Sequence, residues 1–151
     1  MLLVAGALGA LAGWLAVRST DESRIHAVID RLADDAERDD VVAMAPLVSP
    51  SYRDGRGLGH DGVLQALAQY LKARTWSRVL PVKVIVRRIA AGRAEASAKI
   101  ILAAAEGATT KHRVTDAMRI DLVLSREGGH WKVLSAEDWE IPAADVMLMS
   151  H

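Results

Sequence analysis

The chain has 151 residues, which is enough for one ordinary domain and too few for two. Lysine plus arginine and aspartate plus glutamate number 19 each, so no net charge draws the protein to nucleic-acid phosphates, and we predict no nucleic-acid partner. Cysteine is absent, which excludes disulfide bonds, thiolate metal sites and cysteine nucleophiles.

An uncharged apolar stretch opens the sequence at Met1 and ends at Val17, before Arg18. As a helix it would rise about 26 Å, near the lower limit for crossing a hydrocarbon core of roughly 30 Å. We predict that residues 1–18 are a leader that anchors the chain in a membrane; the alternative is a signal peptide cleaved at residues 10–12. The domain behind it is expected on the extracytoplasmic (periplasmic) side, although the arginines that follow the leader favour the cytoplasmic side.

Three helices are predicted next, from apolar residues spaced three and four apart. The first spans Thr20 to Asp39 and begins at the capping-box pattern of residues 19–22. Asp40 caps a short second helix, which Pro46 kinks or shortens. The third helix runs from Asp61 to about Arg74.

The apolar period then changes to two, which indicates antiparallel strands with one buried face. Four strands are expected, at Leu80 to Ile89, Arg93 to Ala103, Val114 to Leu124 and Trp131 to Trp139. Residues 19–141 therefore form one α+β domain, with three N-terminal helices packed on a curved four-stranded antiparallel sheet. The C-terminal tail, residues 142–151, is expected to fray or to cover an opening.

Three segments match one known superfamily: the long first helix, LVSPSYRD at 47–54, and a final hairpin at 120–134 that contains REGGHWKV at 126–133. On these segments the chain resembles the nuclear transport factor 2-like (NTF2-like, SnoaL-like) superfamily. The resemblance implies a cone with a pocket between helices and sheet, and a homodimer through the outer sheet face. It leaves the activity open, because this fold carries isomerases, dehydratases and non-catalytic domains with pockets.

One ionisable residue, Asp116, shares an otherwise apolar strand face with Val114, Met118 and Ile120. A carboxyl group desolvated on such a face can act as a general acid or base, so Asp116 is the candidate catalytic residue. The alternative is a carboxylate solvated at the open end of the strand.

Four further residues are candidates for lining the pocket. Glu137 and Trp139 share the phase of Val133 on the last strand, which would bring a second carboxylate to the same mouth; the alternative is an exposed rim charge. Tyr52 and Asp54 lie in the loop that borders the pocket, where Tyr52 could donate a hydrogen bond to a ligand carbonyl or pack against the next helix. The histidines show no metal-ligand spacing, and we expect neither a metal nor a cofactor.

Two functions follow from these observations. The first, which we favour, is a non-catalytic membrane-tethered module whose cone holds a small apolar ligand or a partner protein, since Ala94, Ala96 and Ala98 leave open volume opposite the helices. The second is a small-molecule isomerase or dehydratase that uses Asp116 as acid/base, assisted by Tyr52 or Glu137.

Overall fold

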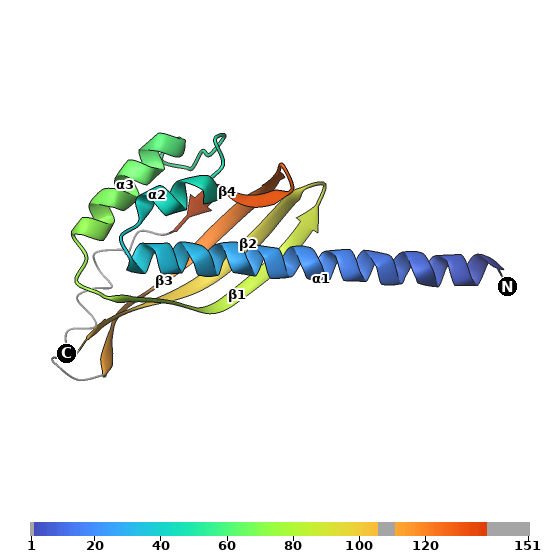
Figure 1. Ribbon diagram of the computed structural model, residues 1–151, viewed down its shortest axis with the longest axis horizontal. Coiled ribbons are helices and arrows are strands. Elements are labelled where there is room, and N and C mark those ends of the chain that lie inside the picture. Colours follow the sequence, from blue (N-terminus) through green and yellow to red (C-terminus); the bar gives the residue numbers. More distant parts are fainter. Residues whose placement is uncertain (1, 106–110, 139–151) are drawn as a thin grey trace.

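The computed structural model describes residues 2–105 and 111–138, with side chains described from residue 13 onward except at 17–19. Its elements are α1 (Leu2–Glu37), α2 (Val41–Met44), the 3-10 helix η1 (Ala45–Leu47), α3 (His60–Lys72), β1 (Arg78–Ala90), β2 (Arg93–Ala105), β3 (His112–Glu127) and β4 (His130–Glu137). The strands form one antiparallel sheet in the order β1-β2-β3-β4, and Figure 1 shows the helices on one of its faces. The predicted fold class is confirmed. Trp139 and the tail at 142–151 lie outside the described residues.

Helix α1 joins the apolar leader to the domain without a break. The helix start predicted at Ser19 is wrong, because the backbone is helical from Leu2 to Glu37. The Thr20 hydroxyl donates to the Ala16 carbonyl at 3.0 Å, which is the contact of a threonine inside a helix and not of a cap. The Ala- and Leu-rich leader has high helix propensity, so the helix continues through the capping pattern.

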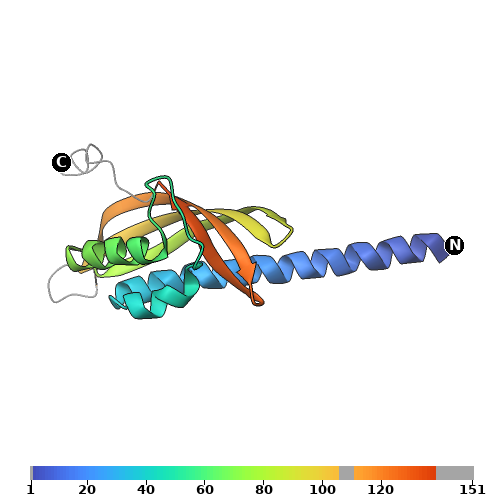
Figure 2. The same cartoon turned by 90° about the horizontal axis from the view of Figure 1, so that it is seen from above.

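Only the C-terminal half of α1 packs on the sheet. Figure 1 and Figure 2 show the other half extending past the hairpin ends of the domain. Within the part of the chain that the structure describes, no helix is long and apolar enough to cross a membrane. Membrane attachment through residues 1–17 therefore stays a prediction.

The region around Pro46 folds as the sequence predicts. The Asp40 carboxylate accepts a hydrogen bond from the Ala43 amide at 3.0 Å and caps α2. Because proline cannot donate to a continuing α-helix, α2 ends at Met44 and Pro46 lies in the first turn of η1.

Two-residue turns close two of the hairpins. Ala91 and Gly92 join β1 to β2 with φ of 51° and 72°, and Gly128 and Gly129 join β3 to β4 with φ of 57° and 80°. Positive φ at both positions of each turn suits the right-handed twist of the flanking strands. Of these four turn residues, Ala91 is the one that is not glycine.

The core lies between the helices and the inner face of the sheet. Ile25, Leu71 and Leu124 are its most deeply buried large side chains. The alanines at 94, 96 and 98 are buried as well, so the centre of β2 presents small side chains to the helices. This arrangement leaves space between the two layers.

A buried polar contact fixes α1 to the end of the β3–β4 hairpin. The Asp21 carboxylate accepts a hydrogen bond from the Trp131 indole nitrogen at 3.2 Å and pairs with the Arg126 guanidinium at 3.5 Å. Arg126 also lies 5.8 Å from the centre of the Trp131 ring. Asp21 is therefore satisfied although it is buried.

Candidate ligand-binding cavity

A cavity of about 170 Å³ lies inside the cone, between the helices and the inner face of the sheet. Every layer contributes to its wall, including Ala33 of α1, Leu67 of α3, Ala98 of β2, Met118 of β3 and Val133 of β4. Short side chains at Ala33 and Ala98, on facing layers, keep the volume open. Of the three β2 alanines that predicted such space, Ala98 lines the cavity, whereas Ala94 and Ala96 are not among its lining residues.

The wall of the cavity is almost entirely apolar. Among the described residues that line it none is charged, and the side chains that carry an oxygen or nitrogen atom are Tyr52, Tyr70 and Trp76. Tyr70 and Trp76 lie with ring centres 6.2 Å apart and interact through their side chains, so they form an aromatic edge to the cavity. Burial, opposed by the hydrogen bond with Trp76 and assisted by the charge of Asp116, raises the pKa of the Tyr70 hydroxyl. That hydroxyl therefore stays neutral at physiological pH.

Tyr70 was not among the residues singled out from the sequence. It lies three residues after Leu67 and seven after Val63, so the helical period that placed those two residues in the core also included Tyr70. Because its side chain ends in a hydroxyl group, Tyr70 was not counted among the apolar residues of that period.

Asp116 lies beside the cavity and does not line it. It pairs across the strands with Leu102, which does line the cavity, so both residues belong to the inner sheet face. The side chain is partly exposed, and one carboxylate oxygen accepts a hydrogen bond from the Ala117 amide at 2.7 Å. Its charge acts on the Tyr70 hydroxyl. Asp116 is thus the ionisable neighbour of an otherwise uncharged pocket.

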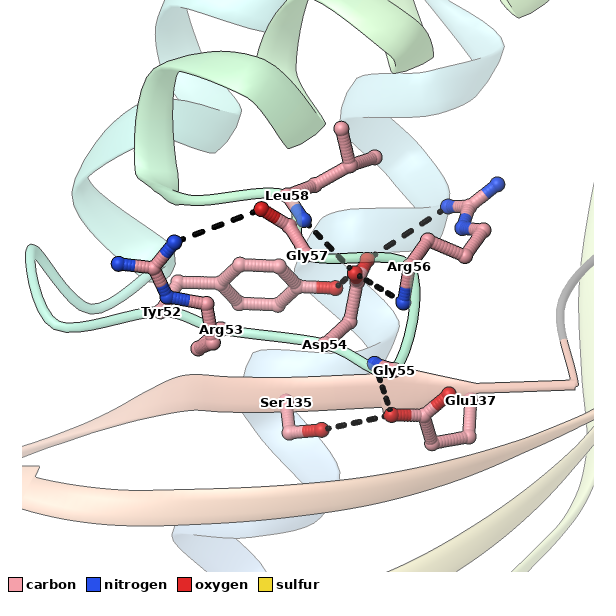
Figure 3. Close-up of polar contacts among 9 residues, drawn as sticks. All are labelled: Tyr52, Arg53, Asp54, Gly55, Arg56, Gly57, Leu58, Ser135 and Glu137. Atoms are coloured by element: carbon pink, nitrogen blue, oxygen red, sulfur yellow. Dashed lines mark hydrogen bonds and ion pairs between the residues drawn. The ribbon is translucent and has the colours of Figure 1, made fainter.

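Tyr52 and Asp54 contact each other, as Figure 3 shows. Tyr52 is 3% exposed, its ring lines the cavity, and its hydroxyl donates to the Asp54 carboxylate at 3.1 Å. The hydroxyl is therefore directed to Asp54, and the ring is what Tyr52 presents to a ligand. Burial and the neighbouring Asp54 charge raise the pKa of Tyr52 far above its usual range.

Asp54 organises the loop that precedes α3. One carboxylate oxygen accepts hydrogen bonds from the backbone amides of Arg56 and Leu58, both at 3.0 Å, and the Arg56 guanidinium lies 3.6 Å from the other. Burial alone would raise the pKa of Asp54, but the Leu58 amide, the Tyr52 hydroxyl and the Arg56 amide and charge outweigh it and lower the pKa. Asp54 is a carboxylate that holds a loop in place, which makes it unsuited to proton transfer.

Glu137 lies on the opposite side of β4 from the cavity. Val123 faces Ser135 and the next residue, Leu124, faces Val133, so a register shift separates Ser135 and Val133 onto different faces. The predicted shared phase of Val133 and Glu137 is therefore wrong. Glu137 accepts a hydrogen bond from the Gly55 amide at 2.7 Å and ties the loop to β4 (Figure 3).

The structure thus brings Tyr52 and Asp54 together, places Asp116 near Tyr70, and puts Glu137 elsewhere. Trp139 lies outside the described residues. Among the residues that are described, no three His, Asp or Glu side chains gather to hold a metal ion.

Comparison with solved structures identifies the fold. A cystatin-like-fold NTF2-like protein from Novosphingobium aromaticivorans superposes with a TM-score of 0.64 at 17% identity, over 93% of this chain and 96% of that one. The chain has the NTF2-like fold. A provisionally assigned scytalone dehydratase from the same organism gives 0.65 at 11% identity, over 85% and 94% of the two chains. A protein of the NTF2-like family from Streptomyces avermitilis, provisionally assigned as a dehydratase, gives a TM-score of 0.62 at 14% identity, over 78% of this chain and 94% of that one.

At these identities the NTF2-like neighbours establish the fold alone. No protein-family model matches the sequence, and no curated protein matches it either.

Proposed function

We propose that this NTF2-like domain is a non-catalytic binding module that holds one small, uncharged, apolar molecule in its cone. The observation that carries this proposal is the cavity itself, which is open and lined by aliphatic and aromatic side chains. Burying apolar surface in such a site is favourable by about 25 cal/mol per Å². A charged ligand would lose its hydration there without gaining a partner.

The chemistry of the wall supports binding over catalysis. An acid/base catalyst has to reach the reacting atom within hydrogen-bond distance. The Tyr52 hydroxyl already donates to Asp54, and the Tyr70 hydroxyl interacts with Trp76. No described residue that lines the cavity carries a titrating carboxyl or imidazole group.

The size of the cavity indicates the size of the ligand. An engineered apolar cavity of about 150 Å³ in another protein stays dry and binds benzene. A cavity of about 170 Å³ suits a molecule such as toluene or a small terpenoid ring fragment.

Titration calorimetry with toluene tests the proposal. Toluene should bind the native chain with one-site stoichiometry, and the Ala98→Leu variant should lose at least tenfold in affinity because the added side chain fills the cavity. The control is Ala117→Leu, the same substitution on the adjacent strand, where Ala117 faces away from the cavity opposite Ile101. Equal affinity of the native and Ala98→Leu proteins would contradict the proposal.

A second function is favoured by one observation, the position of Asp116 on the inner sheet face opposite Leu102, where its charge acts on the Tyr70 hydroxyl. A ligand that extends past Tyr70 would bring a hydroxyl group toward the carboxylate, which could then remove or deliver a proton, as in a dehydratase. Two of the structural neighbours carry a provisional dehydratase assignment.

Mass spectrometry of the ligand separates the two functions. The chain would be incubated with a hydroxylated cyclic ketone, and the binding proposal expects the compound to be recovered unchanged. Loss of water that stops in Asp116→Asn and persists in the neighbouring Thr115→Val variant would replace the binding proposal with the dehydratase.

A further inference from the structure

A second concave site lies on the outer face of the sheet, on the side away from the cone. Its volume is about 690 Å³. The floor is a row of cross-strand neighbours that runs over all four strands: Arg88, Glu95, Val123 and Ser135. We call this site the outer groove.

Two backbone segments form the walls of the outer groove. On one side, the loop that carries Ser51 and Arg53 is fixed to β4 by a hydrogen bond from the Arg53 amide to the Leu134 carbonyl at 3.1 Å. On the other side lies the Ala90–Arg93 turn, which the Arg126 amide holds through a 2.8 Å hydrogen bond to the Gly92 carbonyl. The groove is therefore held open by ordered backbone and does not depend on side chains alone.

Three arginines, at positions 53, 88 and 93, line the outer groove against a single acid, Glu95. Other arginines on the outer face are neutralised: Arg87 and Arg119 both pair with Asp121, at 3.6 and 3.1 Å. In the described part of the chain, by contrast, no carboxylate forms an ion pair with Arg53, Arg88 or Arg93. One guanidinium N–H of Arg53 donates a hydrogen bond to the Gly57 carbonyl at 3.4 Å, and its other N–H groups are available to a ligand.

We propose that the outer groove binds a soluble phosphomonoester. The three arginines and Glu95 leave two net positive charges, and a phosphomonoester carries about −1.5 to −2 at neutral pH, so the charges match. A guanidinium group presents paired donors whose geometry fits phosphate oxygens in a bidentate manner. The Ser51 side chain adds a hydroxyl group to the wall, whereas the Ser135 hydroxyl on the floor already donates to Glu137 at 3.4 Å. The groove is large enough for the phosphate and a small organic group attached to it.

The test follows the backbone amide signals of the full chain in nonionic detergent during titration with glycerol 3-phosphate. Saturable shifts are expected at Ala90, Ala91 and Arg93, which border the groove. Arg88→Ala and Arg93→Ala should each weaken binding by about tenfold, as expected for the loss of a charge-assisted hydrogen bond. Glu95→Gln should strengthen binding severalfold, because it removes the one opposing charge.

Arg87→Ala is the matched control, since it removes the same charge from the same strand outside the groove and should change the affinity less than twofold. An equal loss of affinity in Arg87→Ala and Arg88→Ala would mean that overall charge alone explains the binding, which would overturn the proposal. The same shifts with uncharged glycerol would overturn it too. Shifts that appear on raising the protein concentration alone would assign the groove to a second copy of the chain instead.

Discussion

At the scale of single residues, Tyr52 and Asp54 show how two buried residues beside a pocket can hold a loop in place instead of transferring protons. Both lie where a pocket residue was expected, and both are buried. Their hydrogen bonds are to each other and to the loop backbone, so the carboxylate is held ionised and the phenol neutral. Proton transfer through either group would disturb the hydrogen bonds that hold the loop in place.

Tyr52→Phe tests this role, because it removes the hydroxyl that donates to the buried Asp54 carboxylate. We expect a loss of about 1–3 kcal/mol in the free energy of unfolding at pH 7, measured by urea denaturation. The lowered pKa of Asp54 means that its stabilising contribution is present above the ordinary value of 3.8 and is lost as the pH falls through the folded-state value. The effect of Tyr52→Phe should therefore shrink in acid.

Tyr70→Phe is the matched control, because it removes a hydroxyl that interacts with Trp76, whereas Tyr52→Phe removes one that donates to a carboxylate. The effect of Tyr70→Phe on the free energy of unfolding should be the same at pH 7 and in acid. A Tyr52→Phe effect that is equally independent of pH would show that the link to Asp54 contributes nothing.

At the scale of elements, α1 and the β3–β4 hairpin are joined through Asp21, Trp131 and Arg126. Asp21→Ala leaves the buried indole N–H without its acceptor, which should cost about 1–3 kcal/mol. Hydrogen exchange at the amides of 130–133 should accelerate, while Glu22→Ala, one residue along the helix, should leave it unchanged. Unaltered exchange in Asp21→Ala would mean that apolar packing alone fixes the helix.

The β1–β2 turn offers a stabilising change. Ala91 has a φ of 51°, a region that costs an ordinary L-residue roughly 1–2 kcal/mol. Ala91→Asn creates the Asn-Gly pair that such turns prefer and should raise the free energy of unfolding by about 0.5–1 kcal/mol. Ala90→Asn, placed in the adjoining strand, should lower it. An increase in both variants would contradict the turn assignment.

The sequence predicted the type and order of the helices and strands because their apolar periods are long and regular. It did not predict the continuity of α1, since the capping pattern at residues 19–22 is a local signal and helix propagation from an Ala- and Leu-rich segment outweighs it.

Within the site, the alternation of apolar residues correctly placed Asp116 on the inner sheet face. The same alternation placed Glu137 on the wrong face. The register shift opposite Val123 and Leu124 reverses the phase along β4, and no glycine or proline marks it in the sequence. Open volume was predicted from three β2 alanines, of which Ala98 lines the cavity. The aromatic edge at Tyr70 and Trp76 depends on tertiary packing.

At the scale of the whole molecule, the cone separates two chemically different surfaces. The inner cavity is uncharged and apolar, whereas the outer face is studded with arginines and lysines, some paired and some not. A small apolar ligand and a soluble anion would therefore not compete for one site. The predicted homodimer through the outer face would instead exclude a soluble anion from the outer groove, and it would leave the cavity unchanged.

The methionine methyl groups provide the most direct test of the apolar cavity. The chain has five methionines, and two of them, Met44 and Met118, line the cavity. In a methyl-labelled spectrum, addition of toluene should shift these two signals saturably, with the larger change expected where the ring currents of the ligand are closest. Saturable shifts at Met44 and Met118 would support the account, and a titration in which neither of the two moves would contradict it.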